Sequence, residues 1–274
     1  MPPGVLPWCC GEAARADLSA HTPADRRRAT GSRPMSWTLI VHVHTKHSPD
    51  SLTEPRALVR HAVALGVDVL AVTDHNTWRG AVDALGAVAG AGLPLRVIVA
   101  SEVHTDQGDV IGLFLQDDLR PARAPAFCDA VHEQGGLVVL PHPYKWHRLD
   151  ETLLSRVDLV EVYNARTAKA DNARAAELAR QRRLPELAGP DAHRLGELDL
   201  ARVEFDGPLP AEQAGLKEAL LRSPRRFHTR TGSIWNEWRS QATLLMRRPN
   251  GRLAWNLARG AVRRVMKPGE YALG

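Results

Sequence analysis

The sequence predicts an α/β fold in which buried, mostly parallel strands are joined by crossover helices. Apolar, strand-like runs alternate with stretches of helical periodicity, in units of roughly 25–35 residues. Several runs, such as residues 67–73 and 136–142, are almost continuously apolar, which is typical of strands covered on both faces. No glycine-rich phosphate loop follows the first strand, which weighs against a nucleotide-binding sheet.

The strands are predicted where short apolar or β-branched runs end at turn residues. They are residues 38–43, 67–73, 95–103, 109–115, 136–142, 158–164, 184–193 and 201–205. Helices are predicted between them, with Pro55 in the first turn of one and Gly135–Gly136 closing another. The helical segments are residues 54–65, 78–90, 123–134, 166–183 and 210–221.

Composition places few constraints on this chain of 274 residues, of which 44% are hydrophobic and 24% charged. These values are ordinary for a globular protein, and no apolar run reaches the ~18–20 residues of a transmembrane helix. The N-terminus lacks the apolar core of a secretory signal. Cys9, Cys10 and Cys128 form no disulfide framework, so a reducing, cytoplasmic location is expected.

Three regions differ in composition. Residues 1–34 have no periodicity and are expected to be disordered, or to be an artefact upstream of a true start at Met35. Residues 35–225 form the predicted α/β body, and residues 35–221 of it carry a net charge of −7. Residues 222–274, by contrast, contain twelve Arg or Lys and two acidic residues.

The extension, residues 226–274, is predicted to contain a basic amphipathic helix. Leu253, Trp255, Ala258 and Val262 fall near one another on that helix, and most of its arginines fall elsewhere. Such a helix is suited to docking on the acidic body, to binding nucleic acid or an anionic substrate, or to lying on an anionic membrane. All three interpretations remain open, and the sequence does not indicate an oligomeric state.

Metal-ligand residue types stand at the ends of six strand-like runs. In parallel barrels the carboxyl ends of the strands build the functional site, with residues from several strands. A His-x-His pair on a strand places both imidazoles on one face, where they suit Zn, Fe or Mn. The candidate ligands are too many for one tetrahedral ion and suit two or three. They are His42, His44, Asp50, His75, Glu102, His142, Asp191 and His193.

Other polar residues near these ends have different expected roles. Asp74 is expected to fix the ring of a ligand histidine, and Glu161 and Asn164 to form the wall of the site. His47 should face away from His44 and pack or lie on the surface. Further histidines, including His147, have no supporting pattern.

The motifs "HVHTKHSPDS", "AVTDHN", "ASEVHT", "LPHPYK", "VEVYNAR" and "GPDAH", in this order over residues 36–205, resemble those of the polymerase and histidinol phosphatase (PHP) family of metal-dependent phosphoesterases. The resemblance implies a distorted, TIM-like (β/α)7 barrel with a trinuclear metal site. It implies one ion held by His42, His44, Glu102 and Asp191, a second by Glu102 and His142, and a third by Asp50, His75 and His193.

One position departs from the family pattern. Many members carry a histidine in the hairpin after the glutamate motif, where this sequence has Asp109. Asp109 is therefore a candidate ligand of the second ion, and His104 is the nearby alternative.

The resemblance implies hydrolysis of a phosphoester with a metal-bridging hydroxide as the nucleophile. Lys145 and Arg166 follow strand-end motifs and are candidates for binding phosphate oxygens. His142 or His193 would protonate the leaving group if not fully engaged with a metal. Substrates would be phosphorylated small molecules, nucleotides or short RNA.

Two alternative functions remain. An amidohydrolase also carries His-x-His after its first strand, although "TDH", "DAH" and the absence of a strand-borne lysine argue against it. A metal-stabilised or nucleotide-binding scaffold without catalysis is the other.

Overall fold

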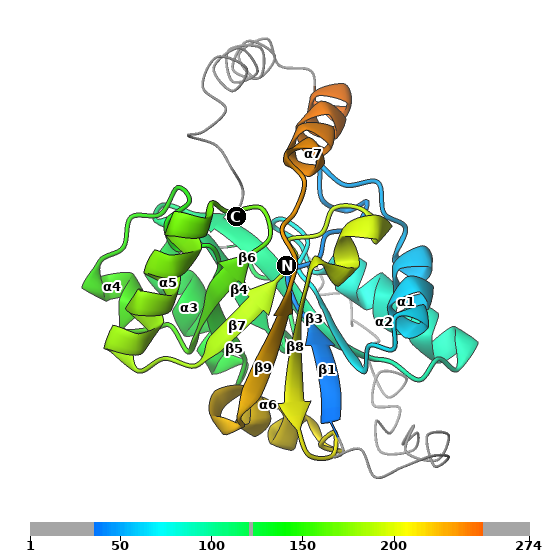
Figure 1. Cartoon of the computed structure of the whole chain (residues 1–274), viewed down its shortest axis with the longest axis horizontal. Coiled ribbons are helices and arrows are strands. Elements are labelled where there is room, and N and C mark those ends of the chain that lie inside the picture. The colour runs from blue at the N-terminus through cyan, green and yellow to red at the C-terminus, as the bar shows by residue number, and fades with distance from the viewer. Residues whose placement is uncertain (1–35, 121–122, 249–274) are drawn as a thin grey trace, which may run out of the picture.

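The computed structural model describes residues 36–120 and 123–248 (Figure 1). The predictions for residues 1–34, for Met35, for Cys9 and Cys10 and for the helical face of residues 253–262 lie outside the described residues. No helix in the described ranges is long and apolar enough to cross a membrane.

Strands and helices follow the predicted alternation. The strands are β1 Ser36–Ile40, β2 Val69–Val72, β3 Arg96–Thr105, β4 Gly108–Leu113, β5 Leu137–Leu140, β6 Leu159–Asn164, β7 Glu186–Gly189, β8 Ala201–Asp206 and β9 Arg225–Thr229. The helices are α1 Pro55–Ala64, α2 Arg79–Ala91, α3 Ala124–Glu133, α4 Glu151–Leu154, α5 Lys169–Arg182, the 3-10 helix η3 Leu195–Leu200, α6 Gln213–Arg222 and α7 Ile234–Arg247.

One curved sheet runs in the order β7-β6-β5-β4-β3-β2-β1-β8-β9 and nearly closes on itself (Figure 1). Beyond the ends of β1 and β7, Val43 and Ala192 form a parallel bridge, reinforced by the His44 N–H donating to Ala192 O at 2.8 Å. At the opposite end, Arg225 of β9 donates to Glu186 O of β7 at 3.1 Å. The predicted α/β barrel is therefore confirmed.

The strands are less uniformly parallel than expected. β3 and β4 form an antiparallel hairpin, and β4 also pairs antiparallel with β5. The short turn leaves no room for a crossover helix, and its Gly108 takes a φ of 111°, which favours glycine. β8 pairs antiparallel with both β1 and β9, and β9 was not predicted.

The core has an inner and an outer part. Inside the barrel, Trp37 stacks on Phe205 with ring centroids 4.2 Å apart, and α6 packs Leu216 and Leu220 into the same cluster. Outside, α1 and α2 cover β1 and β2, while α3, α4 and α5 cover β4 to β6. With α6 on the opposite side, the carboxyl ends of β1 and β7 point toward α7 (Figure 1).

Candidate metal centre

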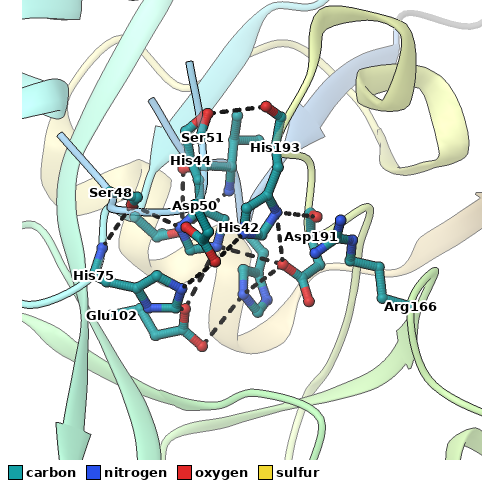
Figure 2. A network of polar contacts seen from close by, with 12 residues as sticks. His42, His44, Ser48, Asp50, Ser51, His75, Glu102, Arg166, Asp191 and His193 are labelled. Atoms are coloured by element: carbon teal, nitrogen blue, oxygen red, sulfur yellow. Dashed lines mark hydrogen bonds and ion pairs between the residues drawn. The ribbon is translucent and has the colours of Figure 1, made fainter. Parts of the chain in front are cut away.

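All the predicted ligand residues except Asp109 meet at the carboxyl end of the barrel (Figure 2). They come from segments far apart in sequence and are almost all buried, with only the His75 side chain as much as a quarter exposed. Three groups of three residues have ligand atoms within 4.8 Å of one another. The groups are His42, His44 and Asp191; His42, Glu102 and His142; and His44, His75 and His193.

The backbone reaches this arrangement differently from the sequence prediction. β1 ends at Ile40, so His42 and His44 lie beyond the regular ladder. His42, His142 and Asp191 take positive φ values of 68°, 27° and 49°, in the region that non-glycine residues adopt at a cost. Both imidazoles of the His-x-His pair still face the same centre, with ring centroids 5.3 Å apart. Such strain commonly marks a functional site.

Glu102 lies between the groups. Its Oε1 is 3.4 Å from His42 Nε2 and 3.1 Å from His142 Nε2. Its Oε2 is 3.5 Å from His44 Nε2 and 3.1 Å from His75 Nδ1. A single carboxylate therefore contacts four imidazoles, as a residue bridging two ions would have to do.

Asp191 and Asp50 face the same histidines from two other sides. Asp191 Oδ1 lies 3.6 Å from His42 Nε2 and 3.4 Å from His44 Nε2. Asp50 Oδ2 lies 2.9 Å from His193 Nε2 and 3.5 Å from the Nε2 of His75. Separations of about 3.0–3.5 Å are those expected between two ligands of one ion at bond lengths near 2.1 Å.

Hydrogen bonds at Nδ1 orient three of the rings. His42 Nδ1 donates to Glu161 Oε1 at 2.9 Å, and His193 Nδ1 donates to Asp191 O at 3.0 Å. His44 Nδ1 donates to Ser48 Oγ at 3.1 Å. When these imidazoles are neutral with the hydrogen on Nδ1, each Nε2 presents its lone pair to the centre, as metal-binding histidines require.

Asp74 accepts hydrogen bonds from residues next to the candidate ligands. Its carboxylate accepts the Thr45 N–H and hydroxyl, both at 2.6 Å, and the Ser48 N–H and hydroxyl at 3.1 and 2.7 Å. Ser48 Oγ in turn accepts from His44 and from the His75 N–H at 2.9 Å. Asp74 therefore positions ligand-type histidines through Ser48 rather than by direct contact.

The electrostatics of the centre favour a cation. Burial alone would lower the pKa of His42, but the surrounding carboxylates, Glu161 foremost, raise it well above its usual value. Burial, together with the charges of His193 and His75, lowers the pKa of His44 to about 3. Although burial opposes the shift, the histidines hold the pKa values of Glu102 and Asp50 below their usual range. The carboxylates thus remain ionised and attract positive charge.

Several donor atoms are buried without a hydrogen-bond partner among the described residues. They include His42 Nε2, His44 Nε2, Asp50 Oδ1, Glu102 Oε2 and His142 Nδ1. Leaving one such atom unsatisfied costs about 1–3 kcal/mol. Three of them, His42 Nε2, His44 Nε2 and Glu102 Oε2, lie together at the Glu102 carboxylate. Nitrogen and carboxylate oxygen ligands of this kind fit Zn, Mn or Fe.

The structure does not bring Asp109 into the groups above. Asp109 Oδ1 pairs with His104 Nδ1 at 2.8 Å, on a hairpin edge where the His104 side chain is 72% exposed. His147, which the sequence pattern did not single out, lies nearer: its ring centroid is 5.4 Å from that of His142. The sequence signal that could have indicated this contact is the short spacing between His142 and His147 in "HPYKWH".

The two candidate phosphate-binding residues, Lys145 and Arg166, differ in burial and in hydrogen-bond partners. Lys145 is half-buried on the loop after β5, and its ammonium has no partner among the described residues. Arg166 is buried and donates from Nη2 to Asn236 O and Ser240 Oγ of α7, while its Nε is buried without a partner. His47, as expected, faces away, toward Asp83 at 2.7 Å.

Comparisons with known proteins identify the family of the chain. The PHP domain family model matches residues 41–221. The uncharacterized protein MJ1587 of Methanocaldococcus jannaschii is 38% identical over 141 residues, 46% of this chain and 80% of that protein. The 5'-3' exoribonuclease Rnm of Escherichia coli is 40% identical over 65 residues, 24% of this chain but only 22% of Rnm.

Among solved structures, one match is a two-domain protein of Bacteroides vulgatus described as containing a predicted PHP-like metal-dependent phosphoesterase. Its TM-score is 0.58 at 19% identity, covering 71% of this chain and 66% of the other. At this identity the likeness concerns the fold.

Proposed function

Because the chain belongs to the PHP domain family, we propose that it is a metal-dependent phosphoesterase that hydrolyses a phosphomonoester, or a short nucleotide or oligonucleotide phosphoester. The observation that carries the proposal is the convergence of buried imidazole and carboxylate atoms that lack hydrogen-bond partners. Such a set is costly to bury unless a cation satisfies it.

The ligand assignment follows the contacts around Glu102. Bound ions of this kind activate water and neutralise charge on a phosphoryl group. The chain's own part is to hold the ligand atoms in place, through Glu161, Ser48 and the carbonyl of Asp191. The proposed ligands are His42, His44, Glu102 and Asp191 for one ion, Glu102 and His142 for a second, and Asp50, His75 and His193 for a third.

Three other groups have proposed roles toward the substrate. Arg166 Nε and the Lys145 ammonium, both without partners among the described residues, would bind phosphoryl oxygens. His142 Nδ1 is buried, has no partner and is the nitrogen that does not face Glu102. It is therefore the better-placed proton donor to a leaving group, with His193 as the other candidate.

Phosphate release over a panel of phosphomonoesters, nucleoside bisphosphates and short RNA tests this function. We expect Asp50→Ala and His75→Ala to lose activity by about 100-fold or more while staying folded, because each removes a ligand of the third ion. His228→Ala is the matched control, since His228 pairs with Glu204 on β8, outside the centre.

Full activity in either ligand variant would contradict the assignment. Amide and lactone substrates belong in the same panel, because hydrolysis of those alone would indicate an amidohydrolase. Stoichiometric metal without any hydrolysis would indicate a scaffold.

A further inference from the structure

Helix α7 is tied at its first turns to a residue beside the candidate centre. Arg166, on the loop after β6, donates from Nη2 to Asn236 O at 2.7 Å and to Ser240 Oγ at 2.6 Å. Figure 2 shows Arg166 on the same side of the centre as Asp191. The start of α7 is therefore fixed to the Asp191 side of the centre.

The last residue of α7 is tied to a second loop beside the centre. Arg247 Nη1 donates to three carbonyl oxygens, those of Lys46 at 3.0 Å, Ser48 at 2.8 Å and Ser51 at 3.0 Å. These carbonyls belong to the loop that carries Asp50. Arg247 therefore joins the end of α7 to three backbone acceptors of that loop.

Between the two anchors lies a pocket of about 400 Å³. Thr243 lines it from α7, Ala57 from α1 and Leu195 from η3. Of the candidate ligands, only Asp50 and His193 reach it. The pocket therefore adjoins the proposed third ion and is separate from the space around Glu102.

The size of the pocket indicates what enters it. A volume of about 400 Å³ lies within the range of roughly 300–1,000 Å³ seen for organic ligands, and a phosphoryl group alone would fill little of it. Leu52, Ala57 and Leu195 give it apolar surface, and Glu54 and Arg194 give it polar atoms. Such walls suit an alcohol with an apolar ring and a few hydrogen-bonding groups.

We propose that α7 forms one wall of this pocket, called here the specificity wall, and that the pocket binds the alcohol half of the phosphoester. Thr243 and Ala57 leave room there for an apolar body about the size of a bicyclic ring. This inference rests on the proposed phosphoesterase function and names its substrate class: esters of bulky, partly apolar alcohols. The two arginine anchors keep the wall at a fixed distance from Asp50 and His193.

The test uses the full chain loaded with Mn²⁺ and two phosphonates, whose P–C bonds resist hydrolysis. Binding of 1-naphthylmethylphosphonate is followed by naphthyl fluorescence, and binding of methylphosphonate by competition. Thr243→Leu narrows the pocket from α7, and Ala57→Leu narrows it from α1 without touching α7. Ala242→Leu adds the same side chain at the exposed neighbouring position of α7.

We expect Thr243→Leu and Ala57→Leu to weaken binding of the naphthyl probe about tenfold or more and to leave methylphosphonate binding within about twofold. Ala242→Leu should bind both probes as the unmodified protein does. Equal loss of both probes, no loss of either, or no binding of the naphthyl probe by the unmodified protein would overturn the proposal.

Phosphate release from 1-naphthyl phosphate and from glycerol 2-phosphate is measured in parallel. If neither ester releases phosphate, the phosphoesterase function is contradicted. The phosphonate-binding results still test the proposed role of α7. If phosphate is released but Thr243→Leu leaves the preference between the two esters unchanged, the proposed role of α7 is contradicted and the phosphoesterase function is not.

Discussion

Glu161 links three parts of the candidate centre through its two carboxylate oxygens. Oε1 accepts from His42 Nδ1 at 2.9 Å, while Oε2 accepts from the His142 N–H and from Asn164 Nδ2, each at 3.0 Å. All the groups that face it are donors. An ionised carboxylate satisfies them together, which fixes the ring of His42 and the backbone of His142.

Replacing Glu161 by Gln should weaken metal binding by about 10–100-fold, because the amide NH2 would face a donor and release the ring of His42. Competition with a chromogenic chelator measures the affinity. Glu218→Gln, at an exposed position of α6 paired with Arg222, is the matched control. Equal affinities in the two variants would show that Glu161 does not orient the ligand.

The types and positions of the candidate ligand residues could be predicted from the sequence because they recur at strand ends, where a barrel gathers its site. The direction of the Asp109 side chain could not be predicted, because Asp109 lies at a hairpin edge. There it forms an ion pair with His104. The contact of His147 with His142 depends on the path of a loop, which no periodicity encodes.

At the scale of elements, the first turn of α2 is packed against the layer beneath the ligands. A Cβ added at Gly80 would lie 1.8 Å from Asp74 Oδ2 and 2.3 Å from Thr45 Oγ1. Only glycine allows this approach, although glycine weakens a helix. Gly86 and Gly90 of the same helix have no atom within 4 Å of such a Cβ.

Gly80→Ala should therefore destabilise the protein by about 1–3 kcal/mol, since it displaces a buried carboxylate that accepts four hydrogen bonds. Gly86→Ala, in the same helix, should stabilise it by about 0.5–1 kcal/mol. Chemical denaturation of both variants provides the measurement. A stabilising Gly80→Ala would mean that Asp74 does not need its present position.

Helices α1, α2, α3, α5 and α6 and most strands could be predicted because their periodicity and end residues are local signals, whereas the short α4 and η3 were not predicted. β9 could not: its sequence, Arg-Arg-Phe-His-Thr, is mostly polar, and all five of its residues pair with β8 at a largely exposed edge. The antiparallel direction of β4 likewise follows from a tight turn rather than from its apolar pattern.

For the molecule as a whole, the centre couples stability to pH and metal. Carboxylates raise the pKa values of His42 and His75 well above the usual value of about 6.5, despite burial. In the metal-free protein this stabilisation is complete below about pH 6.5 and is lost as pH rises through the raised pKa values. Metal binding requires the same imidazoles to be neutral, so it strengthens as pH rises.

The gap in Tm between metal-loaded and chelator-treated protein should therefore widen from about pH 6 to about pH 8. Scanning calorimetry at both pH values, with and without a chelator, measures it. A gap that stays constant or narrows would mean that the histidines do not exchange protons for metal.

The basic extension and the acidic body meet in part through α7, whose Arg247 binds backbone carbonyls beside the centre. This contact depends on acceptors that only the folded loop presents, so the sequence indicated docking as one of several interpretations without indicating where. The fold class and the site's location, by contrast, could be predicted because both follow from patterns repeated along the chain.

Metal stoichiometry by mass spectrometry, on purified protein and on Glu102→Ala, tests the central claim most directly. We predict two or three divalent ions per chain, and the loss of more than one in Glu102→Ala, because Glu102 contacts four imidazoles of the centre. His132→Ala, at an ion pair with Asp158 outside the centre, should keep them all. A purified protein without bound metal after incubation with Zn²⁺, Mn²⁺ and Fe²⁺, or a Glu102→Ala variant with undiminished metal, would contradict the account.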